Sequence, residues 1–153
     1  MSIKTSWRRS VVKAVLVLAL VLLVFSSCTN TSEKIIVARV IDGDTIELED
    51  GDRIRYIGID TPEIGEPYYL EATAKNAELV EGKEVRLEKN VSEEDRYGRL
   101  LRYIYVGDLF VNAELVRWGY ARAHSYPPDT YYAELFSQLE LEAKQAGRGL
   151  WAK

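Results

Sequence analysis

The sequence predicts one α+β domain, mainly β in character, preceded by a separate N-terminal segment. Three observations support this prediction. Polar and apolar residues alternate in short runs between residues 35 and 106, and three other runs place apolar residues at helical spacing. Setting the N-terminal segment aside leaves about 125 residues, a length that suits a single domain with a modest hydrophobic core.

The N-terminal segment is organised like a signal peptide. Residues 1–13 carry four basic residues and no acid, and an apolar run of 12 residues follows from Ala14 to Phe25, too short for an ordinary membrane-spanning helix. The ending Phe-Ser-Ser before Cys28 resembles the lipobox of bacterial lipoproteins, in which the cysteine is acylated. We therefore expect a signal peptide at residues 1–27, a lipidated Cys28 with a polar tether at residues 28–34, and the folded domain at residues 35–153.

Cys28 also determines the expected location. It is the only cysteine, so no disulfide can form within the chain. A lipidated Cys28 predicts an exported protein held at the cell membrane and facing the exterior or the periplasm. Secretion without a lipid, or an uncleaved anchor, is the alternative.

The charge balance restricts the partners. The chain has 20 basic and 24 acidic residues; without the four basic residues of segment 1–13, 16 face 24, a formal charge of −8. This excludes a polycation that coats nucleic acid indiscriminately. A nucleic-acid partner would need a local basic site.

Five short segments are predicted strands. The first three follow one another closely at residues 35–41, 45–48 and 53–59, and the other two are residues 85–87 and 100–106. Five strands with a helix between the third and fourth favour a small closed barrel of the oligonucleotide-binding (OB-fold) type. An open α+β sheet is the alternative.

About three helices complete the prediction. The first, over residues 68–80, has Leu70, Ala74 and Ala77 at helical spacing. The second covers residues 111–118, and we expect Trp118 to face inward there. The third follows Asp129, its expected N-cap, and carries an apolar stripe. This stripe consists of Tyr131, Leu135, Leu139 and Ala143.

Two aspartates suggest a metal site. Asp44 follows an Asp-Gly turn, and taken alone it is a turn acid. Asp60 ends a mostly apolar strand, where an unpaired carboxylate is costly. If the first and third strands are neighbours, their ends bring Asp44 and Asp60 together. Two close carboxylates repel, and a hard divalent cation relieves this repulsion.

Other residues could act on a phosphate. Arg55 and Arg99 suit bidentate capture of a phosphate group, although a salt bridge or an ordinary surface position is the alternative for each. Glu63, after the Thr61-Pro62 turn, could be a general base or a solvated loop acid. Tyr126 could stack a base or simply pack. His124, the only histidine, is interpreted as a surface residue.

Three segments, in this order and spacing, resemble the thermonuclease (staphylococcal nuclease-like) family: VIDGDTIEL, RYIGIDTPE and DRYGRLLRYIYV. The later segments LVRWGYARA and AGRGLW also match, so the resemblance covers residues 35–151. It implies an OB-fold barrel that uses Ca²⁺ to hydrolyse phosphodiester bonds in DNA and RNA and leaves 3′-phosphate ends.

The resemblance also implies roles for individual residues. Asp44, Asp60 and the backbone carbonyl of Thr61 would bind calcium. Arg55 and Arg99 would bind phosphate and act in catalysis. The remaining implied role is Glu63 as general base. Apart from the resemblance, we expect Tyr97 and Tyr126 to contact the substrate.

We expect a monomer that acts with little sequence specificity and prefers single strands. The alternative is a catalytically silent OB-fold module that binds nucleic acid or a protein partner. A binding module does not need the complete set of catalytic and metal residues, so their joint presence argues against this alternative. The set is Asp44, Arg55, Asp60, Glu63 and Arg99.

Overall fold

The computed structural model describes residues 34–152, so the predicted signal peptide, Cys28 and most of the tether lie outside the described residues. No helix in this part of the chain is long and apolar enough to cross a membrane. The strands are β1 (Val37–Asp42), β2 (Thr45–Leu48), β3 (Arg53–Tyr56), β4 (Ile59–Asp60), β5 (Arg86–Glu88), β6 (Leu100–Val106), β7 (Leu109–Phe110) and β8 (Arg122–Ala123). The helices are α2 (Tyr69–Val80), α3 (Val111–Arg117), α4 (Ala133–Gln145) and the 3₁₀ helix η1 (Gly149–Trp151).

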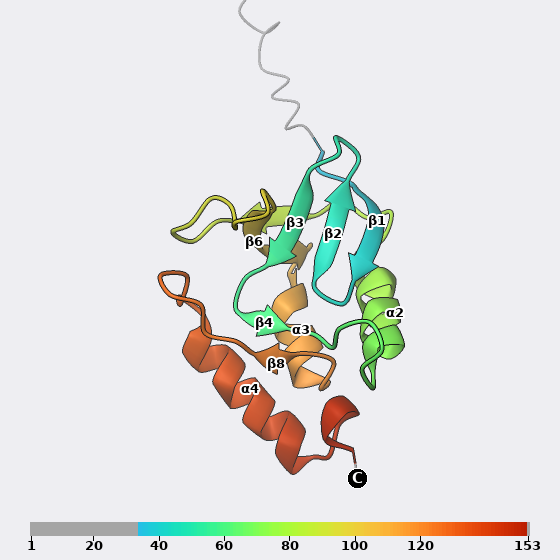
Figure 1. Cartoon of the computed structure of the whole chain (residues 1–153), viewed down its shortest axis with the longest axis vertical. Coiled ribbons are helices and arrows are strands. Elements are labelled where there is room, and N and C mark those ends of the chain that lie inside the picture. The colour runs from blue at the N-terminus through green and yellow to red at the C-terminus, as the bar shows by residue number, and fades with distance from the viewer. Residues whose placement is uncertain (1–33, 153) are drawn as a thin grey trace, which may run out of the picture. The chain divides into compact units, whose positions relative to one another are not determined.

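The main sheet has the strand order β1-β2-β3-β6-β5, and β7 pairs with β6 (Figure 1). Only β3 and β6 are parallel. The residues before β5 return to the start of β1: Ile36 bridges Glu84, and the Val85 N–H donates to the Ile35 carbonyl at 2.8 Å. Backbone hydrogen bonds therefore continue around the five strands, which confirms the predicted α+β, mainly β fold.

The third predicted strand is two strands. β3 ends at Tyr56, and β4 pairs with β8 in a separate two-stranded sheet. Gly58 turns the chain between them with φ +80°, and a Cβ there would lie 2.5 Å from the Phe136 ring. Asp60 therefore leaves the barrel and lies on the β4–β8 ribbon.

The helices bury different faces from those predicted. In α2 the buried residues are Ala72, Asn76 and Val80, whereas Leu70 is 73% exposed. The α2 interface therefore includes a buried asparagine that the apolar spacing of the sequence does not reveal.

The last helix differs in a similar way. α4 begins at Ala133, after the predicted start, and buries Phe136, Leu139 and Ala143, so its buried face is displaced by one residue from the predicted stripe at its N-terminal end. Asp129 is not its N-cap, because its side chain binds a distant loop. Trp118 follows the end of α3 and is 48% exposed rather than inward.

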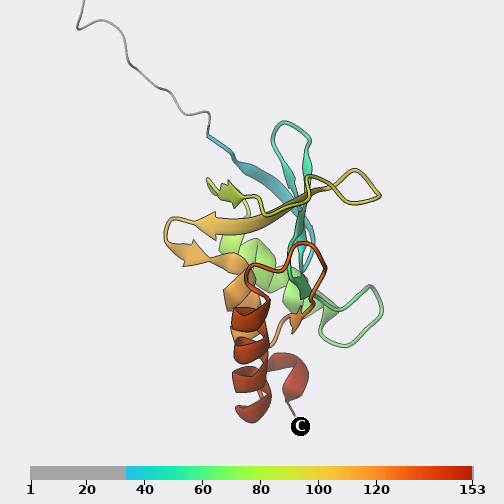
Figure 2. The same cartoon turned by 90° about the vertical axis from the view of Figure 1, so that its left-hand side faces the viewer.

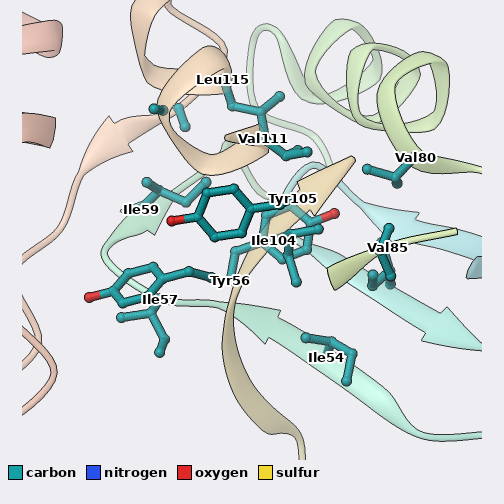
Figure 3. Packing of buried hydrophobic residues seen from close by; sticks show 14 of the residues in the cluster. Ile54, Tyr56, Ile57, Ile59, Val80, Val85, Ile104, Tyr105, Val111 and Leu115 are labelled. Atoms are coloured by element: carbon teal, nitrogen blue, oxygen red, sulfur yellow. The ribbon is translucent and has the colours of Figure 1, made fainter. Parts of the chain in front are cut away.

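The core lies between the sheet and helices α2, α3 and α4. Figure 3 shows the Tyr56 and Tyr105 rings among aliphatic side chains, including Ile59 and Val111. Tyr103 contacts the Tyr132 ring edge to face at 4.7 Å between ring centres, which joins α4 to β6. This packing holds the ribbon of β4 and β8 against the barrel, and the candidate site forms where the two meet.

Candidate active site

Asp44 is a buried carboxylate in the turn between β1 and β2, with 5% of its surface exposed. Its Oδ2 accepts hydrogen bonds from the Thr61 N–H at 2.8 Å and the Thr61 hydroxyl at 3.0 Å, and its Oδ1 accepts one from the Thr45 hydroxyl at 3.2 Å. Burial raises the pKa of Asp44 to about 6, although Arg55 acts to lower it.

Gly43 allows this turn to reach Thr61. A Cβ at Gly43 would lie 2.7 Å from the Cβ and the Oγ1 of Thr61. The turn also depends on Asp42, whose Oδ1 accepts the Asp44 N–H at 3.0 Å. The Asp-Gly-Asp sequence therefore has a specific role, since its glycine permits close contact between two segments that are distant in sequence.

Arg55 links the two aspartates of the predicted metal site. The pairing of β2 with β3 places Arg55 opposite Thr45. Its Nε lies 3.0 Å from Asp44 Oδ1, and its Nη2 lies 3.0 Å from Asp60 Oδ1. Its Nη1 donates to the carbonyls of Tyr56 and Ile59 at 2.7 and 2.9 Å, across the bend that follows β3. One guanidinium therefore holds both carboxylates and the bend that positions Asp60.

This arrangement corrects the reasoning that placed the aspartates together. The first and third strands are not neighbours, because β2 lies between them. Asp44 reaches Arg55 because it immediately precedes β2, which pairs with β3. Asp60 reaches the same arginine because the chain bends after Tyr56. The two aspartates meet through a shared arginine.

Arg99 lies beside this group, just before β6. Its Nε donates to Asp95 Oδ2 at 2.7 Å, and its Nη1 donates to the Thr45 hydroxyl at 3.4 Å. The Thr45 hydroxyl in turn donates to Asp44. Thr45 and Asp95, which were not candidates from the sequence, therefore connect Arg99 to the aspartate site. The recognisable signal for Asp95 is its place in the turn that carries Arg99.

A cleft of about 240 Å³ lies beside Arg55 and Arg99. Its lining includes Arg55, Asp60, Asp95, Arg96, Tyr97, Arg99, His124 and Tyr126. Figure 2 shows the loop of residues 92–99 (yellow) and the loop of residues 61–68 (green) projecting on the same side of the domain. The structure therefore brings both predicted phosphate-binding arginines and both predicted substrate tyrosines to one cleft.

Glu63 and His124 lie at the edges of this region. Glu63 is exposed and lines a second hollow, which shares Tyr97 and Arg99 with the cleft. His124 is exposed, as expected for a surface residue, and its ring centre lies 5.9 Å from that of Tyr126 on the cleft wall.

The side chains of the site fit a hard divalent cation. Asp44 and Asp60 supply carboxylate oxygens, the ligands that calcium prefers, and the Asp60 side chain is 45% exposed and accessible. Within residues 34–152 no group of three or more His, Cys, Asp or Glu side chains gathers as a metal site. A cation at Asp44 and Asp60 would therefore take further ligands from backbone carbonyls and water, in exchange for contacts that Arg55 now makes.

Three buried polar residues that the sequence did not assign to the site support it. Asn112 accepts the Ile104 N–H at 2.9 Å and donates to the Ile57 carbonyl at 3.0 Å. Asn76 donates to the Asp42 carbonyl at 2.9 Å and accepts the Tyr56 hydroxyl at the same distance. These hydrogen bonds hold Asp42, which precedes Asp44, and the two residues that follow Arg55, Tyr56 and Ile57.

The third of these residues, Asp129, joins the two walls of the cleft. Its Oδ1 accepts the N–H groups of Val91 and Ser92 at 2.8 and 2.9 Å. These hydrogen bonds attach the segment of Tyr126 to the loop of residues 92–99. Asparagines and aspartates at inward positions are the sequence signal for such residues, but their partners are distant in the chain.

Comparison with known proteins identifies the family. Residues 53–153 match the model described as staphylococcal nuclease homologue. The chain is 36% identical over 159 aligned residues to a thermonuclease of Staphylococcus intermedius, covering 91% of this chain and 95% of the relative. It is 38% identical to a thermonuclease of Staphylococcus hyicus, with 76% and 74% covered. It is also 40% identical to endonuclease YncB of Bacillus subtilis strain 168, with 75% and 60% covered.

The residues matched by the family model include both arginines of the site and also Asp60 and Glu63. Each of these relatives aligns with at least three quarters of this chain. These similarities confirm the family predicted from the three sequence segments. On this evidence the chain belongs to the staphylococcal nuclease homologue family.

Proposed function

We propose that this protein is an exported, calcium-dependent nuclease that hydrolyses phosphodiester bonds in DNA and RNA and leaves 3′-phosphate ends. Membership of a family whose relatives are named thermonuclease and endonuclease supports the nuclease activity. One structural observation carries the proposal: Arg55 and Arg99 reach the same cleft, and both connect to Asp44.

The two arginines bind the phosphate group. A guanidinium can donate two parallel hydrogen bonds to phosphate oxygens and stabilise the charge that develops on them during in-line displacement. Asp95 orients Arg99 through contacts to its Nε and Nη2, and the carbonyls of Tyr56 and Ile59 orient Arg55. Both guanidinium groups are therefore positioned before the substrate arrives, which lowers the cost of reorganisation.

The acidic residues divide into two roles. Asp44, Asp60 and the Thr61 carbonyl would hold calcium, which would supply positive charge next to the phosphate oxygens. The Thr61 N–H and the hydroxyls of Thr61 and Thr45 fix the Asp44 carboxylate in orientation. Glu63, exposed beside Arg99 in the adjoining hollow, accepts the proton of the attacking water.

The cleft favours single strands. Tyr97 and Tyr126 present aromatic rings on which an unpaired base can stack, and such stacking tolerates any base. The enzyme would therefore act on DNA and RNA with little sequence specificity, and we propose that it does so as a monomer.

A catalytically silent barrel that binds nucleic acid is the alternative function. Cleavage and binding of one labelled oligonucleotide should be measured in parallel for the wild type and for Asp44→Ala with calcium present. We expect the wild type to cleave and Asp44→Ala to bind the oligonucleotide with little cleavage. Arg39→Ala, which removes an exposed partner of Glu47, is the matched control and should cleave normally. Binding without cleavage by the wild type would support the silent barrel.

Export and lipid attachment rest on the sequence alone. A basic start, an apolar stretch and Cys28 support a lipoprotein held at the membrane and facing outward. Cys28→Ala should release the protein from the membrane fraction or block its processing. An unchanged membrane fraction would indicate an uncleaved anchor.

A further inference from the structure

Two tryptophans, Trp118 exposed and Trp151 half-buried, lie with three cations on a surface outside the cleft. The Arg148 Cζ lies 5.0 Å from the centre of the Trp118 ring, which is 48% exposed. Around Trp151, the Lys144 Nζ lies 4.5 Å and the Arg122 Cζ 5.9 Å from the ring centre. We call these five residues the basic tryptophan surface.

The backbone holds this surface in place. The Leu150 N–H donates to the Gly119 carbonyl at 2.8 Å, and the Arg148 Nη1 donates to the Arg117 carbonyl at 3.0 Å. A Cβ at Gly119 would lie 2.3 Å from the Arg148 carbonyl oxygen, so the two segments are in direct contact. The ends of α3 and α4 and helix η1 therefore present Trp118 and Trp151 from one framework.

The surface carries three cations in a chain of negative net charge, and the Glu114 carboxylate beside it accepts the Trp118 indole N–H at 3.1 Å. Lys144 pairs with Glu140, but within residues 34–152 Arg122 and Arg148 form no ion pair. Two guanidinium groups beside aromatic rings are therefore available to an anion. Because the chain as a whole carries an excess of acids, a polyanion would be drawn to such a local site.

This surface continues from the cleft. β4 and β8 are antiparallel, and Asp60 is the direct partner of Arg122. Side chains of directly opposed residues project from the same face of a sheet, so Arg122 projects beside Asp60. Figure 1 shows β8 between β4 and α4, whose C-terminal end carries Lys144. Arg122 therefore connects the cleft to Trp151.

We propose that the basic tryptophan surface binds the part of a single-stranded nucleic acid that extends beyond the cleft. The proposal rests on the proposed nuclease function, because the cleft must hold the neighbouring nucleotides. Trp118 stacks a base, and Arg122 and Arg148 bind phosphates. Stacking platforms combined with cations are the general means by which proteins hold single strands without sequence preference.

The test compares short and long substrates with the full-length protein. Binding and cleavage of an oligo-dT trinucleotide and a 12-nucleotide oligo-dT should be measured for the wild type and Trp118→Ala. We expect Trp118→Ala to weaken 12-mer binding by roughly 5- to 150-fold, the usual effect of losing one stacked base. The affinity for the trinucleotide should not change. Trp118→Phe should retain most of the 12-mer affinity.

Further variants separate charge from stacking. Arg148→Gln should reduce the slope of log affinity against log salt by about 0.7 for the 12-mer, the value expected for one phosphate contact on a single strand. Tyr131→Ala removes an exposed aromatic side chain that is not part of the surface. It should leave the affinity for both substrates unchanged.

The outcomes are distinguishable. If Trp118→Ala lowers the affinity for both substrates equally, or for neither, the proposal is overturned and the tryptophans have a packing role only. A wild type that binds the 12-mer but cleaves neither substrate would contradict the nuclease function. The dependence of binding on Trp118 would still decide the role of the surface.

Discussion

Two sets of polar residues hold the same bend in different ways. In the neutral set, Asn76 and Asn112 each use one donor and one acceptor on partners close to Asp42, Tyr56 and Ile57. In the charged set, Asp44 and Asp60 share the single guanidinium of Arg55. The neutral set is balanced in hydrogen bonds, whereas the charged set has two negative groups against one positive group.

This difference separates stability from function. Replacing a buried neutral residue that pairs both a donor and an acceptor leaves its partners unsatisfied and lowers the stability of the fold. An excess negative charge in a buried position is unfavourable for folding alone, as the raised pKa of Asp44 indicates, but it favours a divalent cation. The neutral set therefore maintains the bend, and the charged set is the part to which we assign the proposed chemistry.

The largest effect expected from the charged set is on turnover. Arg99→Ala should lower kcat by about 10²–10³, because it removes one positioned donor to the phosphate group. The melting temperature should change little, since Arg99 is partly exposed and its partner Asp95 also accepts two backbone N–H groups. Steady-state kinetics and a thermal melt measure both quantities. Near-normal kcat would remove Arg99 from the site.

The largest effect expected from the neutral set is on folding. Asn112→Ala leaves the Ile104 N–H and the Ile57 carbonyl without their partner, which should lower the free energy of unfolding by about 2–3 kcal/mol. Urea denaturation measures this change. Ser137→Ala, on the exposed side of α4, is the control and should cost less than about 0.5 kcal/mol. Equal effects in the two variants would contradict the role given to Asn112.

The charged set should also respond to pH. The pKa of Asp44 is about 6 in the folded protein, above the ordinary value of 3.8, because of burial. Its ionised form therefore costs stability without a cation, and this cost appears as pH rises from about 4 to about 6. Calcium needs the ionised form, so calcium affinity by calorimetry should be about tenfold lower at pH 5 than above pH 7. A pH-independent affinity would exclude Asp44 as a ligand.

The smallest effect is expected from an exposed ion pair that belongs to neither set. Lys75 and Glu78 lie 2.8 Å apart on α2. Glu78→Gln should change the free energy of unfolding by less than about 0.5 kcal/mol, because water already screens the pair. If Glu78→Gln lowered the free energy of unfolding as much as Asn112→Ala, the larger effect expected of the buried asparagine could not be attributed to its burial.

Local patterns predicted much of the fold and of the site. The alternation of the strands, the spacing of the helices and three segments around Asp44, Asp60 and Arg99 were sufficient for the fold class and the family. Most of the predicted site residues line the cleft, and Glu63 lines the adjoining hollow. Asp44 and Thr61 lie behind Arg55 and Thr45, to which Asp44 is bound. These features depend on residues close together in the chain.

Features that depend on distant partners were not predictable. Alternation continues through Gly58, so the pattern does not show that β3 ends at Tyr56 and that β4 pairs with β8. Trp118 follows the end of α3, where helical spacing no longer determines direction. Asp129 resembles a helix cap but binds Val91 and Ser92, almost 40 positions earlier.

The most direct test of the proposed chemistry is to identify the ends produced from single-stranded DNA and RNA, with calcium and then with a chelator. We predict cleavage that needs calcium and leaves 3′-phosphate ends on both nucleic acids. Cleavage that survives chelation would contradict the cation role of Asp44 and Asp60. Products with 5′-phosphate ends would contradict the assignment of the scissile bond.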